Sequence, residues 1–190
     1  MNRRLLSHPS IVSDTVGTLK KGGLVVYPTD TLYGFGVIGT DGEAIQRINR
    51  IKGRTGPMSV IAPDTATART WARCTPDEWA TILTELGGAT TVIFPVKPGI
   101  VHPSLLGPDH SLGVRIPRQP SILSIVARLG QPLTTTSVNR TGQAPCNDPD
   151  EIERQFGSEI DLLIDGGHLP ASSGSRIFKL DHSTLKMIRP

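Results

Sequence analysis

The stretch that decides the fold is LVVYPTDTLYG, residues 24–34. Its first four residues, Leu24 to Tyr27, form a short apolar run rich in β-branched side chains, which predicts a buried strand. The strand runs into a polar turn that carries two threonines, an aspartate and a tyrosine before Gly34. Hydroxyls and backbone amides at the end of a strand are a common setting for a small polar ligand, although the same residue types also build ordinary turns.

The glycines that follow, in GFGVIG at residues 34–39, match the G-x-G-x-x-G pattern of dinucleotide-binding loops. They begin six residues after Pro28 instead of directly at the end of the strand. Arg54 also stands about where that pattern needs an acidic residue. We therefore reject a dinucleotide site and expect these glycines to let the backbone turn tightly beside the ligand.

Composition restricts the class of protein further. A chain of 190 residues is long enough for one sizeable core without disulfides, and Cys74 and Cys146 have no paired spacing that predicts a disulfide or zinc site. The first residues lack the uninterrupted apolar segment of a signal peptide, and no apolar run approaches transmembrane length. We expect a cytoplasmic protein, and the net charge of +3 favours an anionic ligand or weak RNA contact.

Apolar spacing and cap residues predict helices and strands along the whole chain. The predicted helices cover residues 11–21, 41–52, 75 to the glycine pair at 87–88, 120–129 and 148–157. The predicted strands cover 24–27, 60–62, 90–96, 111–116, 132–137, 162–165, 175–180 and 185–189, with loops at 98–108 and 138–147. No repeat or linker interrupts them, so we expect a single α/β domain over residues 1–190, α+β by stricter schemes, with a mixed sheet.

Two groups of basic residues have competing interpretations. Lys52 and Arg54 lie where a predicted helix ends, which suits the helix dipole but also suits a clamp for phosphate groups. Arg115 lies inside the predicted strand 111–116, where a charge is costly unless an internal carboxylate or a ligand pairs with it. We favour a ligand for Arg115, because Gly113 beside it leaves room for one.

Small polar residues mark two further strand ends. Ser137 and Asn139 are spaced to face one way, and Ser173-Gly174-Ser175-Arg176 opens another strand. No G-x-S-x-G nucleophile motif, Walker A motif or metal-ligand spacing of histidines is present, so we predict no metal ligands among the side chains and no P-loop.

Taken together, these motifs resemble the YrdC/TsaC family of threonylcarbamoyl-AMP synthases. The family pattern runs P-T-[DE]-T-x-Y-G, K-x-R, G-x-x-T, V-R-x-P-x-x-P, S-x-N-x-[ST]-G, and D-G-G before a late S-T-[IV]. This chain shows Pro28–Gly34, Lys52 with Arg54, Gly88 with Thr91, Val114–Pro117 with Pro120, Ser137–Gly142, Asp165–Gly167 and Ser175–Ile177. The motifs occur in order over nearly the whole chain, and their combination makes the resemblance specific.

The resemblance implies a twisted mixed sheet of the YrdC/RibB type, with helices on both faces and a concave, positively charged surface. It also implies that L-threonine, bicarbonate or CO2, and ATP react to give threonylcarbamoyl-AMP and pyrophosphate, with Mg²⁺ on the phosphates. Partner proteins would then transfer the threonylcarbamoyl group to tRNA, and contact of tRNA with this chain stays open. We expect a monomer or weak dimer without membrane contact.

By position, the resemblance implies that threonine is bound by Thr29, Arg115, Ser137 and Ser175, with Arg115 contacting the carboxylate of threonine. It assigns ATP to Lys52, Arg54, Asn139 and Arg189. In this mechanism Lys52, Arg54 and Arg115 act through charge and positioning, because the carbamate oxygen is itself the nucleophile and no dedicated base is needed.

Several features depart from the family pattern. The loop after Arg54 is about two residues short, and Ile61, Gln119 and Arg176 replace the usual residues. The main alternative is a module of the same fold that binds double-stranded RNA or tRNA without chemistry. A second alternative is a carbamoyl-transfer module of hydrogenase maturation, but this chain lacks the cysteines that bind zinc there. A third is a sister group with degraded motifs, and the presence of Lys52, Arg54 and Asn139 argues against it.

Overall fold

The stretch at residues 24–34 forms two paired strands instead of one strand and a turn. The computed structural model describes residues 1–190, in which β2, Val25–Pro28, pairs antiparallel with β3, Tyr33–Gly36. The tight turn expected of the glycines in this stretch was wrong for Gly34 and Gly36, which lie within β3, and only Gly39 lies in a turn. A side chain at Gly36 would meet the ring of Tyr27 at 2.5 Å, so this glycine makes room for that ring.

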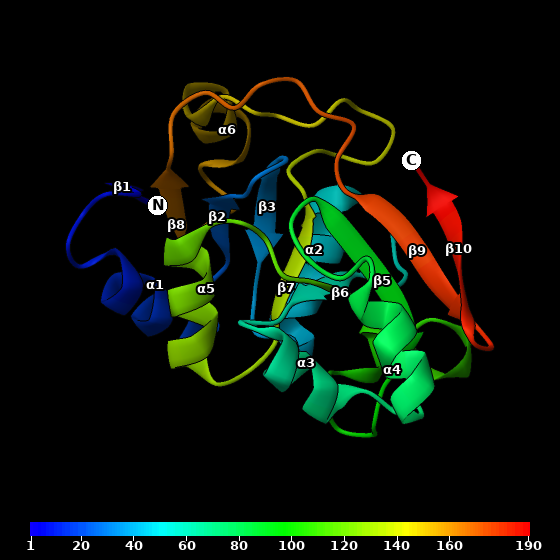
Figure 1. Ribbon diagram of the computed structural model, residues 1–190. Helices are drawn as coiled ribbons and strands as arrows, with labels where there is room; N and C mark the ends of the chain where they lie inside the picture. Colours follow the sequence, from blue (N-terminus) through cyan, green and yellow to red (C-terminus); the bar gives the residue numbers. More distant parts are fainter.

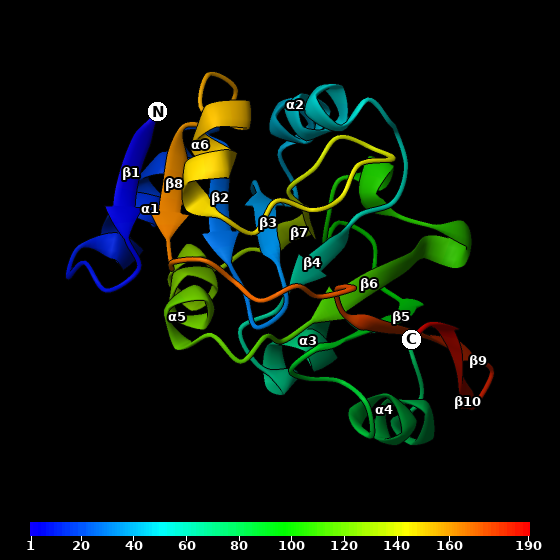
Figure 2. The same cartoon turned by 90° about the horizontal axis from the view of Figure 1, so that it is seen from above.

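The mixed sheet that we predicted is confirmed, with ten strands in the order β1-β8-β2-β3-β7-β4-β6-β5-β9-β10. Parallel pairs such as β2 with β8 stand beside antiparallel pairs such as β5 with β6, and Figure 2 shows the sheet twisting along its length. The other strands are β1 Asn2–Leu5, β4 Ser59–Ile61, β5 Thr90–Pro95, β6 Ser111–Arg115, β7 Leu133–Ser137, β8 Leu162–Asp165, β9 Arg176–Asp181 and β10 Thr184–Arg189.

Six helices pack on this sheet (Figure 1). They are α1 Ile11–Lys20, α2 Gly42–Lys52, α3 Thr65–Trp71, α4 Pro76–Leu83, α5 Pro120–Leu129 and α6 Pro149–Phe156, and two 3-10 turns, η1 Pro103–Leu105 and η2 Pro108–His110, lie in the loop before β6. The five predicted helices are present. The short α3 and β1 were not predicted, and α4 ends at Leu83, several residues before the glycine pair.

Neighbouring side chains of the central strands enter different apolar clusters, which shows that both faces of the sheet are covered. Val25 lies in a cluster with α1 and α5, whereas Val26 lies in the larger cluster with α2, α3, α4 and α6. Helices on both faces of a single mixed sheet are therefore confirmed. None of the helices has the length and apolar character needed to cross a bilayer.

Helices α1 and α5 cover only part of their face of the sheet. On paired strands β4 and β7, Ile61 and Leu133 are register partners in the α1/α5 cluster. Ser59 and Thr135 form the register pair two residues further along, on the same face, and they line a cavity. The cavity is thus the continuation of the α1/α5 face beyond the area that the two helices cover.

Candidate functional site

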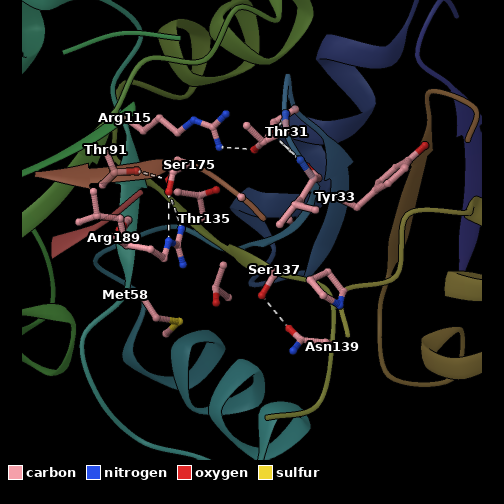
Figure 3. A pocket seen from close by; sticks show the side chains of 18 of the residues that line it. Thr31, Tyr33, Met58, Thr91, Arg115, Thr135, Ser137, Asn139, Ser175 and Arg189 are labelled. Atoms are coloured by element: carbon pink, nitrogen blue, oxygen red, sulfur yellow. Dashed lines mark hydrogen bonds between the residues drawn. The ribbon is translucent and has the colours of Figure 1, made fainter. Parts of the chain in front are cut away.

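All eight predicted site residues line one cavity of about 400 Å³, part of which Figure 3 shows at close range. They are Thr29, Lys52, Arg54, Arg115, Ser137, Asn139, Ser175 and Arg189. They come from the turn between β2 and β3, the end of α2, strand β6, the end of β7, the start of β9 and the end of β10. Residues up to 160 positions apart in the sequence therefore converge on one polar hollow.

The cavity lining is basic and rich in hydroxyl groups. Its cations are Lys52, Arg54, Arg115 and Arg189, and no aspartate or glutamate belongs to the lining. Ten serines and threonines share it: Thr29, Thr31, Ser59, Thr91, Thr135, Thr136, Ser137, Thr141, Ser173 and Ser175. This arrangement suits an anionic ligand with many oxygen atoms, and the concave basic surface that we expected is confirmed.

Arg115 is buried and paired with an internal carboxylate, which our sequence interpretation did not favour. Its guanidinium forms an ion pair with Asp30 and donates to the hydroxyl of Thr31 at 2.8 Å and to the carbonyl of Gly88 at 3.1 Å. Burial lowers the pKa of Arg115, and the charge of Asp30 acts in the opposite direction. Arg115 nevertheless stays on the cavity lining, with Asp30 behind it.

We expected Gly113 to leave room for a ligand, and this was wrong. A side chain there would come within 2.4 Å of the hydroxyl of Ser59 on the adjacent strand β4. The glycine therefore makes space for Ser59, and Ser59 in turn lines the cavity. Gly113 therefore shapes the site by placing the hydroxyl of Ser59 and not by direct approach of a ligand.

Lys52 is buried and fastens the loop after β7 to the end of α2. Its ammonium donates to the carbonyls of Ser137 and Asn139 at 2.6 and 3.1 Å and to Oδ1 of Asn139 at 2.8 Å. These three bonds use all the donors of an ammonium group. Burial, together with the nearby charge of Arg54, lowers the pKa of Lys52 to about 8.

Both the oxygen and the nitrogen of the Asn139 side-chain amide form hydrogen bonds within the chain. Its Oδ1 accepts from Lys52 and from the hydroxyl of Ser137, and its Nδ2 donates to the carbonyl of Gln143 at 2.7 Å.

Arg54, in contrast, is half-buried on the cavity lining, and its guanidinium has no hydrogen bond or ion pair within the chain. Of the group assigned to ATP, Arg54 is therefore the cation most available to a ligand.

The polar residues at the β9 side of the cavity are linked to each other. The hydroxyls of Ser175 and Thr91 lie 2.8 Å apart, and Arg189 donates to the carbonyl of Ser175 at 3.1 and 2.7 Å (Figure 3). Thr29, in contrast, uses its hydroxyl inside its own turn, where it donates to the carbonyl of Leu32. For Thr29 the ordinary turn interpretation therefore describes its contacts well.

A β-bulge brings Arg189 onto the cavity lining. Met187 is the register partner of Phe178 and Arg189 that of Ile177, so Ile188 is an extra residue between the two pairs. In a regular ladder Ile188 would lie opposite Ile177, and Arg189 would point to the other face of the sheet. The extra residue thus decides which side chain of β10 faces the cavity.

Sequence reasoning missed several lining residues, among them Thr31, Ser59, Met58 and Thr135. A signal was present for Thr135, since the polar run at residues 134–137 lies in an otherwise apolar strand prediction. Strand alternation alone would have placed Thr135 on the same face as Ser137.

The departures from the family pattern lie mostly outside the cavity lining. Ile61 is buried in the α1/α5 cluster, Gln119 precedes α5, and Arg176 pairs with Glu85 at 3.2 Å. None of these three residues lines the cavity, although Pro57 and Met58, which follow the shortened loop, do. The chain contains no group of three or more histidine, cysteine, aspartate or glutamate side chains that could hold a metal ion.

A family model, curated proteins and solved structures all match this chain, and the matches are related to one another. The Sua5/YciO/YrdC family model, described as telomere recombination, matches residues 17–190. The threonylcarbamoyl-AMP synthase of Neisseria gonorrhoeae is 34% identical over 176 residues, which are 90% of this chain and 90% of that protein. The crystal structure of Escherichia coli YciO has a TM-score of 0.86 and 26% identity, and the match covers 99% of this chain and 92% of that one.

Proposed function

Because this chain belongs to the Sua5/YciO/YrdC family, we propose that it is a threonylcarbamoyl-AMP synthase. The enzyme makes threonylcarbamoyl-AMP and pyrophosphate from L-threonine, bicarbonate and ATP. The amino group of threonine and bicarbonate first form a carbamate and release water. An oxygen of this carbamate then attacks the α-phosphorus of ATP, and the bond between that phosphorus and the bridging oxygen breaks as pyrophosphate leaves.

The observation that carries the proposal is the cavity with four cations, ten hydroxyl side chains and no acidic residue. A reaction between two anionic groups needs a site that neutralises their charge and holds them together, more than it needs a proton acceptor. Orientation of two reactants contributes roughly 7–11 kcal/mol to lowering a barrier, so a cavity without a general base is adequate for this step.

The two substrates divide the cavity between its two sides. Threonine is assigned to the side with Arg115 and Ser175, where the guanidinium binds its carboxylate. The triphosphate is assigned to the side with Arg54, whose free guanidinium binds phosphate oxygens, while Lys52 adds charge and holds Asn139 in place. Thr29, Ser137 and Arg189 complete the lining around the two substrates.

The donor set of the cavity does not fit a magnesium ion held by the protein. Mg²⁺ is usually bound through one or two carboxylates together with phosphate oxygens, and the lining has no carboxylate. We therefore assign any Mg²⁺ to the nucleotide alone. Transfer of the product to proteins that modify tRNA, and a cytoplasmic location, are parts of the same proposal.

The test is pyrophosphate release from ATP by the purified protein. We expect release only when L-threonine and bicarbonate are both present, with threonylcarbamoyl-AMP detected by mass spectrometry. Release without threonine would contradict the proposal. Salt-sensitive binding of double-stranded RNA without any release would favour the RNA-binding module instead.

The affinity for ATP is expected to fall as the pH rises through 8, because Lys52 has a pKa of about 8. A neutral amine has two donors for the three acceptors that the ammonium now serves, so the hold on Asn139 weakens. We expect the Kd for ATP to rise roughly tenfold between pH 7 and pH 9, measured by calorimetry.

The variant Lys52→Arg is the control for this pH dependence, since arginine keeps its charge over the same range. Its ATP affinity should be lower than that of the wild type but independent of pH between 7 and 9. A wild-type Kd that stays constant over this range would contradict the role given to Lys52.

A further inference from the structure

Asp30 joins separate segments of the chain beside the cavity. It lies in the turn between β2 and β3, where one carboxylate oxygen pairs with Arg115 of β6. Its other oxygen accepts from the backbone amide of Arg118 at 3.0 Å, just before α5 begins. The side chain of Asp30 is only 17% exposed, and Asp30 does not belong to the cavity lining. It therefore contacts the site through Arg115.

The contacts of Arg115 fix its guanidinium and still leave donors for a ligand. A guanidinium has five N–H groups, and the acceptors on Gly88, Thr31 and Asp30 use three of them. The remaining two, one on each terminal nitrogen, have no acceptor within the chain. Because Arg115 lines the cavity, these two N–H groups are available to a ligand there, and a carboxylate is a suitable partner.

Asp30 also makes the distribution of charge within the cavity asymmetric. The charge of Arg115 is balanced by Asp30, whereas Lys52, Arg54 and Arg189 form no ion pair within 4.0 Å. A triphosphate is therefore drawn most strongly to Lys52 and Arg54, whose charges lie close together at the end of α2, whereas Arg189 lies beside Ser175 and acts on Arg115. A zwitterionic amino acid, which has no net charge, suits Arg115 itself, whose charge Asp30 balances.

We propose that Asp30 is a positioning residue that reserves Arg115 for the carboxylate of the amino acid substrate. It orients the guanidinium and reduces the attraction of Arg115 for phosphate groups. This inference rests on the proposed function, since it takes the threonine carboxylate as the ligand of Arg115. It adds that the Asp30 carboxylate keeps the amino acid site and the triphosphate site of the cavity distinct.

The test compares Asp30→Asn with the wild type in steady-state kinetics. We expect the KM for threonine to rise roughly tenfold or more, because Arg115 loses its fixed orientation, while the KM for ATP changes less than about twofold. We expect pyrophosphate to compete only with ATP in the wild type and to compete with threonine as well in the variant. Asp30→Glu, which keeps the charge, should recover part of the threonine affinity.

Asp181→Asn is the matched control, since Asp181 pairs with Lys186 in the exposed β9–β10 hairpin and does not line the cavity. Its kinetics should equal those of the wild type. Equal KM values for threonine in Asp30→Asn and the wild type would overturn the inference. Failure of the wild type to bind threonine at all in calorimetry would instead overturn the proposed function.

A second comparison applies if Asp30→Asn does not fold. The double variant Asp30→Asn with Arg115→Gln leaves no buried charge without a partner, and it is compared with Arg115→Gln alone. Because Asp30 acts through Arg115, we expect both variants to have the same residual threonine affinity. A further loss of affinity in the double variant would show that Asp30 acts independently and would overturn the inference.

Discussion

Replacing Arg115 with alanine is expected to abolish threonine-dependent pyrophosphate release, with kcat/KM lowered by roughly a thousandfold or more. Two losses add up to this effect. The guanidinium that we assign to the threonine carboxylate disappears, and bidentate contacts of this kind supply both binding energy and orientation. In addition, Asp30 and the hydroxyl of Thr31 lose the partner that keeps the β2–β3 turn in place.

The same variant should also be less stable, by about 1–3 kcal/mol in the free energy of unfolding, because Asp30 keeps only the amide of Arg118 as a partner and the hydroxyl of Thr31 and the carbonyl of Gly88 lose a buried donor. Chemical denaturation measures this loss. Kinetic measurements at a temperature where the variant is still folded separate the loss of stability from the loss of activity. The control is Arg128→Ala, which removes an exposed arginine of α5 without an ion pair. Threonine-dependent activity that persists in Arg115→Ala would contradict the assignment of the threonine carboxylate to Arg115.

Replacing Lys52 with methionine is expected to weaken ATP binding more than tenfold and to lower the free energy of unfolding by roughly 2–4 kcal/mol. Methionine matches the length of the lysine stem but donates no hydrogen bond. The carbonyls of Ser137 and Asn139 and the Oδ1 of Asn139 would each lose the bond from the ammonium in a half-buried position. The carbonyl of Ser137 and the Oδ1 of Asn139 would each keep one other donor. The loop after β7 would then be tied to α2 only by the backbone amide of Thr141, which donates to the carbonyl of Lys52, and by Arg140, which donates to the carbonyl of Ile51.

Calorimetry with ATP and denaturation in urea test these two effects together. Lys20→Met is the matched control, because Lys20 is exposed in the last turn of α1 and outside the cavity. We expect it to keep both the affinity and the stability of the wild type. An ATP affinity in Lys52→Met equal to that of the wild type would show that the loop needs no such anchor.

Much of the fold followed from local patterns in the sequence. Five helices had either a cap residue or a regular apolar face, and the strands of the mixed sheet had apolar runs of the right length. The elements that escaped prediction lack such signals. Strand β3 has two glycines in four residues, β1 is polar, and α3 contains three threonines within seven residues. Their structure depends on neighbours instead of local propensity.

The candidate site was predictable in its members but not in its contacts. The motifs and the family resemblance named the eight residues that meet in the cavity. The partner of Arg115 could not be read from the sequence, because Asp30 is 85 positions away and only the sheet topology brings the two together. Two of the three acceptors of Lys52 are backbone carbonyls, which carry no sequence signal at all.

The β-bulge in β10 makes the last strand tolerant of a change in its length. If Ile188 were deleted, the arginine would follow Met187 directly and would still lie opposite Ile177, now in a regular ladder. If Ile188 stayed and the bulge closed, isoleucine would replace arginine over the cavity, and Arg189 would lie opposite Arg176, a like-charge pair across two strands. Chains of this kind could therefore differ by one residue here and keep the same cation, because its place follows from strand pairing and not from its position along the sequence.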